Sequence, residues 1–276
     1  MKIEIEEYLP HIRPWVESLA NTFPGKQIKP QFAFWEVGHI LSLILLGGTT
    51  ILMNLRLLNT GLTEEPPSEI YRNLRFWQNV GVIGIVVTGV LIGSANAERL
   101  YDSAAFIVKM LALIAGIILT YGASRPVAAA EGRVSTASKI WFAIGTAIFL
   151  LGLWVFLISD LINVGVYHII TAAALIVLFV TRGRLRLVYA GVLIAMIVAQ
   201  YVNTHIVIKP DDYDHLNPVN KLWTGAFSAW IGGVAVFQLF RAGRGEAGGP
   251  LTKFIAYATI LVWVMGAAAG RWIAFA

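Results

Sequence analysis

Eight long apolar segments constrain the fold of this 276-residue chain more than any other feature. A helix needs about 20 mostly apolar residues to cross the roughly 30 Å hydrocarbon core of a membrane. Segments of this kind, each bounded by charged residues, proline or glycine, lie at roughly 33–54, 77–95, 104–122, 140–160, 162–181, 187–206, 222–240 and 254–275. Because the pattern has no strand-like alternation, helices are the expected spanning structure. The sequence predicts an all-α polytopic membrane protein with eight transmembrane helices.

The composition supports this class and excludes several others. Charged residues make up 13% of the chain, about half of the roughly 25% that is typical of soluble domains. The chain has no cysteine, which excludes cysteine-ligated iron–sulfur clusters, thioether-attached haem and thiolate zinc sites. The net charge of +5 is what basic loops of a membrane protein produce. We therefore expect membrane lipid, and no nucleic acid, as a partner.

The loop charges predict the direction in which the segments cross the membrane. Loops 1, 3, 5 and 7 contain most of the basic residues, namely Arg56, Arg72, Arg75, Arg125, Arg133, Lys139, Arg182, Arg184, Arg186, Arg241, Arg244 and Lys253. The positive-inside rule places these loops in the cytoplasm. Both termini of this multi-pass protein are then periplasmic, if the membrane is a bacterial inner (plasma) membrane.

The N-terminal residues 1–31 precede the first apolar segment and contain four prolines and several glutamates. Ile12, Trp15, Val16, Leu19 and Phe23 recur there at helical spacing. This pattern predicts an amphipathic segment that lies on the membrane surface. An ordinary loop with some apolar residues is the alternative.

The order of landmarks in the chain suggests an internal repeat. Runs that begin at His39 and His168 end in Leu-Arg-Leu at 55–57 and 185–187. The third and seventh segments open near Lys109 and Lys221, and the fourth and eighth at Lys139 and Lys253. We predict two parallel four-helix repeats, over 32–160 and 161–276, with a pseudo-twofold axis along the membrane normal. Chance similarity among apolar segments is the alternative.

Ionisable groups inside membrane spans are costly and therefore point to function. Most of the polar candidates fall in the outer halves of the spans: Glu36, His39, Lys109, Asp160, His168, Asn203, His205, Lys221 and Arg271. The inner halves are expected to be almost wholly apolar, with Thr50, Asn54, Asn79 and Thr88 as the only polar residues deeper in the first half. A transporter needs polar groups that continue across the membrane, so this asymmetry favours a one-sided site near the outer surface.

The repeat-related pair His39 and His168 could supply both axial ligands of a b-type haem, which needs no cysteine. Lys109, Lys221 and Arg271 could then pair with the haem propionates. Glu36 lies three residues before His39 and could orient its imidazole. Interfacial histidines, and basic side chains that reach the lipid headgroups, are the alternatives for these residues.

An alternative interpretation is a metal site formed by His39, His168 and His205 together with the outer loop that ends in Asp214-His215. Histidine and aspartate could bind copper or zinc there, although the spacing matches no named site and a solvated loop is the alternative. The methionines are scattered, without the pairs that Cu(I) transport favours.

These features predict a b-type haem-binding membrane protein that transfers electrons on the periplasmic side, with a periplasmic redox protein or a larger membrane complex as its partner. The alternatives are a non-catalytic subunit of a larger complex and a copper-handling membrane protein. No nucleophile–base constellation stands out, so enzymatic activity is left open.

Several short motifs resemble an uncharacterised bacterial family of four-helix membrane proteins. The matching residues are Trp35 and His39, the exit Asn54-Leu55-Arg56-Leu57-Leu58, Lys109, and Gly270-Arg271-Trp272-Ile273-Ala274. The chain is similar to a fused double form of that unit, although His168 lacks the preceding tryptophan. It is also distantly similar to CopD-like copper-resistance membrane domains, whose early helix has a comparable histidine. The resemblance implies the four-helix architecture and a shared histidine.

Overall fold

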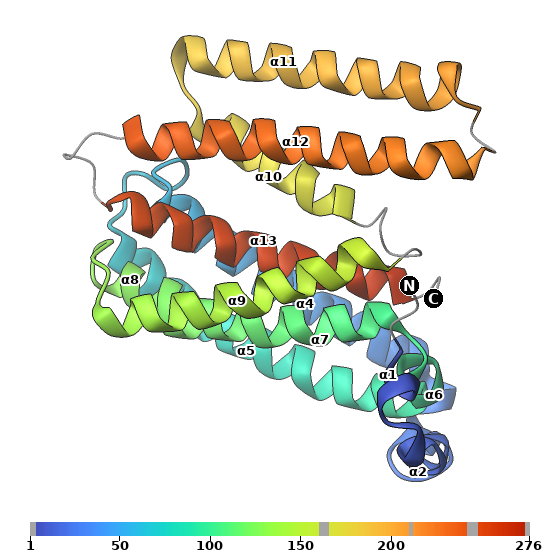
Figure 1. Ribbon diagram of the computed structural model, residues 1–276. Coiled ribbons are helices and arrows are strands. Elements are labelled where there is room, and N and C mark those ends of the chain that lie inside the picture. The colour runs from blue at the N-terminus through green and yellow to red at the C-terminus, as the bar shows by residue number, and fades with distance from the viewer. Residues whose placement is uncertain (1–3, 160–165, 210–211, 242–247, 274–276) are drawn as a thin grey trace. The chain divides into compact units, whose positions relative to one another are not determined.

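The computed structural model describes residues 4–159, 166–209, 212–241 and 248–273, and these residues form helices with no strand among them. The predicted all-α class is therefore confirmed for the described residues. The elements shown in Figure 1 are α1 (Ile5–Tyr8), η1 (Pro10–Ile12), α2 (Arg13–Leu19), α3 (Gly25–Ile28), η2 (Lys29–Gln31), α4 (Phe32–Leu57), α5 (Pro67–Ala95), α6 (Ala97–Tyr101), α7 (Ala104–Ile117), η3 (Ile118–Ser124), α8 (Arg125–Ala129), α9 (Thr136–Ile158), α10 (Val166–Val180), α11 (Gly183–Val202), η5 (Asn203–Val207), α12 (Tyr213–Arg241) and α13 (Pro250–Trp272).

Six helical stretches of the described chain are long and apolar enough to cross a membrane: Gly25–Leu57, Pro67–Ala95, Ala104–Ala129, Thr136–Ile158, Gly183–Val207 and Pro250–Trp272. They correspond to six of the eight predicted segments. The other two predicted segments overlap α10 and α12, which are helical but do not belong to this set of six. The count of eight spans and the repeat therefore stay predictions.

The helices divide into two compact units, one formed by residues 1–166 and 247–276 and the other by residues 167–246. In the first unit α4 packs closely along α5, and α7 packs along α9. The backbones of α4 and α5 approach closely at Gly81, where a Cβ atom would lie only 2.8 Å from the backbone nitrogen of Leu46. Glycine at this position lets the two helix backbones meet.

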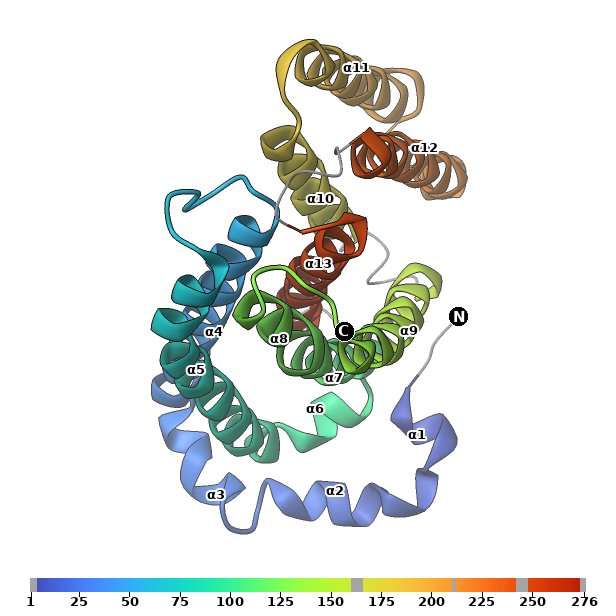
Figure 2. The same ribbon diagram turned by 90° about the vertical axis from the view of Figure 1, so that its left-hand side faces the viewer.

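The last helix, α13, packs against α4, α7 and α9 in the first unit (Figure 2). It buries a larger share of its apolar window than any of the other five candidate spans. Gly116 on α7 leaves room for the Trp263 ring, which a Cβ atom would approach to 2.8 Å, and the Trp263 indole donates to Thr120 Oγ1 at 3.0 Å. The predicted division of the chain at residue 160 places 254–275 in the second repeat, whereas the packing places this segment in the first unit.

The second unit contains α10, α11 and α12. Tyr189 of α11 is fully buried, donates its hydroxyl to the carbonyl of Ala174 on α10 at 3.0 Å, and stacks on Trp230 of α12. Arg186 donates to the carbonyls of Leu178, Phe179 and Thr181 at the end of α10. Arg186, which we predicted as a determinant of membrane topology, therefore also satisfies carbonyls that have no hydrogen-bond partner within the helix.

The N-terminal helices pack on α6 through Val16, which forms a small core with Ala97 and Tyr101. Part of the apolar face that we assigned to the membrane surface is therefore covered by protein, while Trp15 (63% exposed) and Phe23 (81% exposed) stay uncovered. Isolated helices as short as the seven-residue α2 are marginal in water, which explains why α2 relies on this packing.

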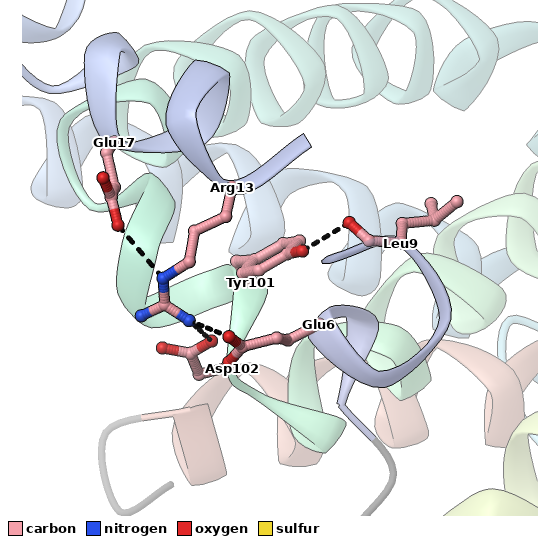
Figure 3. A network of polar contacts seen from close by, with 6 residues as sticks. All are labelled: Glu6, Leu9, Arg13, Glu17, Tyr101 and Asp102. Atoms are coloured by element: carbon pink, nitrogen blue, oxygen red, sulfur yellow. Dashed lines mark hydrogen bonds and ion pairs between the residues drawn. The ribbon is translucent and has the colours of Figure 1, made fainter. Parts of the chain in front are cut away.

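A polar network reinforces the same contact (Figure 3). Arg13 pairs with Glu6, with Glu17 at 3.0 Å and with Asp102 at 3.7 Å, and the Tyr101 hydroxyl donates to the carbonyl of Leu9 at 2.5 Å. The hydrogen bond from Arg13 lowers the pKa of Glu6 below its ordinary value. Burial raises the pKa of Asp102 in spite of the nearby guanidinium.

Candidate functional site

His39 lies in the second turn of α4 and is buried, with 8% of its surface exposed. Its Nδ1 atom is 2.9 Å from the Thr88 hydroxyl on α5, and that hydroxyl donates to the carbonyl of Gly84 at 2.5 Å. A hydroxyl has a single hydrogen, so the Thr88 oxygen must accept a hydrogen bond from Nδ1–H of His39. The contact therefore fixes the tautomer of His39 and leaves the lone pair on Nε2. Thr88, and not the exposed Glu36, orients the imidazole.

Lys109 on α7 faces the other side of the same ring. Its Nζ atom is 3.3 Å from Nε2 of His39, a distance at which the ammonium donates to the lone pair. Gly89 makes room for the ring, since a Cβ atom there would lie 3.3 Å from Cε1 of His39, and Gly270 lies beside Lys109, where a Cβ atom would be 3.6 Å from Cε in ordinary contact. Helices α4, α5, α7 and α13 therefore meet around His39 and Lys109.

The remaining predicted site residues have less enclosed surroundings. Arg271 is exposed and follows Gly270 in the last turn of α13. His168 on α10 and Lys221 on α12 are exposed and belong to the second unit, so their pairing with His39 and Lys109 stays a prediction. Asp160 lies outside the described residues.

His205 and the outer loop show pairwise contacts. The exposed His205 stacks on Tyr201, with ring centroids 4.5 Å apart, and its Nδ1 is 2.9 Å from the Thr204 hydroxyl. His215 is 2.8 Å from the Asp212 carboxylate, whose hydrogen bond raises the pKa of His215 and lowers that of Asp212. In the part of the chain that the structure describes, no three His, Cys, Asp or Glu side chains form a group that could hold a metal ion. Copper binding by these residues stays a prediction.

A second polar cluster lies at the opposite end of α4, α5 and α7, where we expected mostly apolar surroundings with a few polar residues such as Thr50 and Asn54. Gln78 donates to the Thr50 hydroxyl at 3.4 Å, Asn54 donates to the Thr50 carbonyl at 2.8 Å, and Ser124 donates to Asn54 Oδ1 at 2.7 Å. All four side chains are fully buried. The sequence pattern pointed to Thr50 and Asn54 but not to Gln78 and Ser124, which come from other helices and join them only through packing.

Arg125 adjoins this cluster, at the start of α8 and directly after the π-helical segment η3. We predicted it as a topology determinant in a loop, but it is helical and buried, with 9% of its surface exposed. Its Nη1 atom donates to Asn79 Oδ1 at 2.8 Å, and the Tyr121 hydroxyl donates to the same oxygen at 2.9 Å. A π-helical turn within an α-helix often marks a functional site, but the sequence pattern does not predict this π-helical turn.

Apolar side chains separate the two clusters. Between the level of His39 and that of Thr50, the buried residues include Leu46 on α4, Ile85 on α5 and Ala112 on α7. The two clusters lie about 15 Å apart along the axis of α5, because Thr88 of the first cluster and Gln78 of the second are ten residues apart. The first unit therefore has two distinct polar sites, one at each end of the same helices.

Comparison with known proteins identifies the family of the chain. A family model described as a family of unknown function, DUF6644, matches residues 14–165. Neither the curated proteins nor the solved structures gave a match. The matched range covers α4 to α9, and so includes His39, Thr88, Lys109 and Arg125, whereas α13 lies beyond it. Because the match spans more than half of the sequence, the chain belongs to the DUF6644 family.

Proposed function

We propose that this chain is a multi-pass protein of a bacterial inner membrane that binds b-type haem through His39 and transfers electrons on the periplasmic side. The observation that carries the proposal is the fixed tautomer of His39. Metal-ligating histidines typically donate their second ring N–H to an oxygen acceptor, which orients the ring and raises the basicity of the ligating nitrogen. Thr88 provides this acceptor at 2.9 Å and leaves Nε2 as the available donor atom.

The residues fit one axial ligand of such a haem. A neutral buried imidazole is a strong nitrogen ligand, and the non-covalent b-type attachment suits a chain without cysteine. Six-coordinate iron needs a second ligand, and His168 is our candidate for it. When bound, the haem would supply one-electron redox chemistry, while Thr88 would hold the ligand ring in position.

Lys109 has a different position from the propionate clamp that we predicted. Its ammonium donates to Nε2 of His39, the same lone pair that iron would take. The two uses of this nitrogen are mutually exclusive, so haem binding requires the ammonium to leave Nε2. Arg271, which follows Gly270 beside Lys109, would then supply positive charge near the carboxylate groups of the cofactor.

The finer architecture belongs to the same proposal: eight spans in two four-helix repeats, with both termini periplasmic and loops 1, 3, 5 and 7 cytoplasmic. The surroundings of Lys109 support the shared side of the termini. His39 near the start of α4 and Gly270 near the end of α13 both lie beside it. The start of α4 and the end of α13 therefore lie at the same end of the first unit, which supports placing both termini on one side.

The test is a reduced-minus-oxidised absorption spectrum of the detergent-purified protein from haem-replete cells. We expect Soret and α bands, which His39→Ala and His168→Ala should each abolish or shift. His205→Ala is the matched control, because this histidine stacks on Tyr201 and has no role as a haem ligand in the proposal, so the spectrum should stay unchanged. A featureless spectrum of the wild-type protein that added haemin does not change would overturn the proposal. Co-purifying subunits would then test the alternative of a non-catalytic subunit.

A further inference from the structure

A cleft of about 400 Å³ lies beside Arg125, at the end of the first unit opposite His39. It is lined by Tyr71, Asn79, Tyr121, Arg125 and Pro126, so no acidic side chain is among its lining residues. The Arg125 guanidinium lies 4.4 Å from the centre of the Tyr121 ring and 5.4 Å from that of Tyr71. Two aromatic rings therefore hold a positive charge in the wall of the cleft.

The charge of Arg125 has no acidic partner in the part of the chain that the structure describes. Its one hydrogen bond there runs from Nη1 to Asn79 Oδ1, whereas a guanidinium has five N–H donors. Stacking on an aromatic face leaves the in-plane N–H groups available. A buried, unpaired charge is costly, so a bound anion would stabilise this arrangement.

Asn79 adds further donors to the same cleft. Its Oδ1 atom already accepts hydrogen bonds from Arg125 and from the Tyr121 hydroxyl. The donors of its side chain are therefore the two N–H groups on Nδ2, which make no hydrogen bond within the described residues. The cleft combines a guanidinium and an amide N–H₂ group without a competing carboxylate.

We propose that this cleft binds a phosphate group, either from an anionic phospholipid headgroup or from free phosphate. The guanidinium fork matches phosphate oxygens in a bidentate geometry. Asn79 and Arg125 lie at the cytoplasmic boundary of the predicted spans 77–95 and 104–122, which is the depth of lipid headgroups. The proposal is independent of haem binding, because the cleft is at the other end of the helices.

The test uses the full-length protein in two arms, with fold checked by circular dichroism and size-exclusion chromatography. Native mass spectrometry measures retention of phosphatidylglycerol against phosphatidylcholine, and calorimetric titration of delipidated protein measures binding of inorganic phosphate. Arg125→Gln removes the proposed anchor. Asn79→Asp keeps oxygen acceptors for Arg125 and Tyr121 but replaces the amide donors with a negative charge. Arg72→Gln is the control, since Arg72 is exposed on the same end of α5 and pairs with Glu69.

We expect Arg125→Gln and Asn79→Asp each to weaken the observed binding by about tenfold or more, the change that 1.4 kcal/mol produces. Arg72→Gln should bind as the wild type does. Retention of phosphatidylglycerol alone identifies the lipid headgroup as the source, and phosphate binding alone identifies the soluble anion. Wild-type binding by Asn79→Asp in both arms, or no binding by the wild type in either arm, would overturn the proposal, whether or not Arg125→Gln folds.

Discussion

The hydrogen bond between His39 and Thr88 determines which ring nitrogen of His39 carries the proton and which one keeps its lone pair. Thr88→Val preserves the side-chain shape but removes the hydroxyl that lies 2.9 Å from Nδ1 of His39 in a buried position. The loss of such a partner costs about 1–3 kcal/mol. We expect this decrease in the free energy of unfolding, measured by denaturant titration in detergent. Thr171→Val is the control, because its hydroxyl bonds only to its own helix on an exposed face. Equal effects of the two substitutions would contradict the assigned contact.

Lys109→Leu tests whether the ammonium competes with a metal for His39. The substitution removes the donor that lies 3.3 Å from Nε2 and leaves an apolar side chain without a metal-ligating atom. Since the lone pair is then free, we expect tighter binding in a haemin titration of the purified protein. Weaker binding would instead support the propionate clamp that the sequence suggested.

Asp212→Asn should lower the pKa of His215 toward its ordinary 6.5, because the carboxylate hydrogen bond raises it. The raised pKa means that the contribution of protonated His215 is fully present below its unfolded-state pKa and disappears as the pH rises through the folded-state value. The lowered pKa of Asp212 acts in the opposite direction and is lost in acid. NMR titration of labelled histidines, assigned with the His215→Gln variant, provides the measurement. An unchanged titration of His215 in Asp212→Asn would contradict the contact.

At the scale of the elements, helix packing depends on small residues at defined positions. Gly81→Ala would place a Cβ atom 2.8 Å from the Leu46 backbone, so α4 and α5 must separate. Overpacking of this kind costs about 1–3 kcal/mol. Gly48→Ala meets nothing within 4 Å and should be neutral or stabilising, since alanine favours helix. Thermal unfolding of both variants measures the difference, and a neutral Gly81→Ala would contradict this packing.

The helices themselves could largely be predicted, because apolar length is a strong local signal. The first unit's apolar spans, and His39 and Lys109 as candidate residues, follow from it. The second polar cluster could not be predicted in the same way. Thr50, Gln78 and Ser124 come from different helices, and each is a single weak signal until packing brings them together. Arg125 was misplaced because basic residues at the end of a span usually indicate a loop.

At the scale of the whole molecule, the order of the chain does not indicate which helices form a unit. The repeat pattern groups α13 with the second half, but Ile255, Val262 and Met265 are fully buried in the first unit. The apolar content of a segment predicts that it forms a helix, but it does not predict which other helices pack against it. The fit between Gly116 and Trp263 decides this packing, and it links residues 147 positions apart in the sequence.

Membrane topology is also a property of the whole chain, and the absence of cysteine makes it directly measurable. We expect Lys26→Cys to react with a membrane-impermeant maleimide from the periplasmic side and Glu64→Cys only from the cytoplasmic side. Both side chains are exposed. Labelling of intact spheroplasts and inverted vesicles distinguishes the two sides. Labelling of both cysteines from the same side would contradict the proposed orientation.

The central claim is that His39 is a haem ligand, and a haemin titration followed at the Soret band tests it most directly. The account predicts saturable, stoichiometric binding by the wild-type protein, loss of that binding in His39→Ala, and normal binding in the exposed-histidine control His205→Ala. Identical titration curves for the wild type and a folded His39→Ala variant would contradict the account.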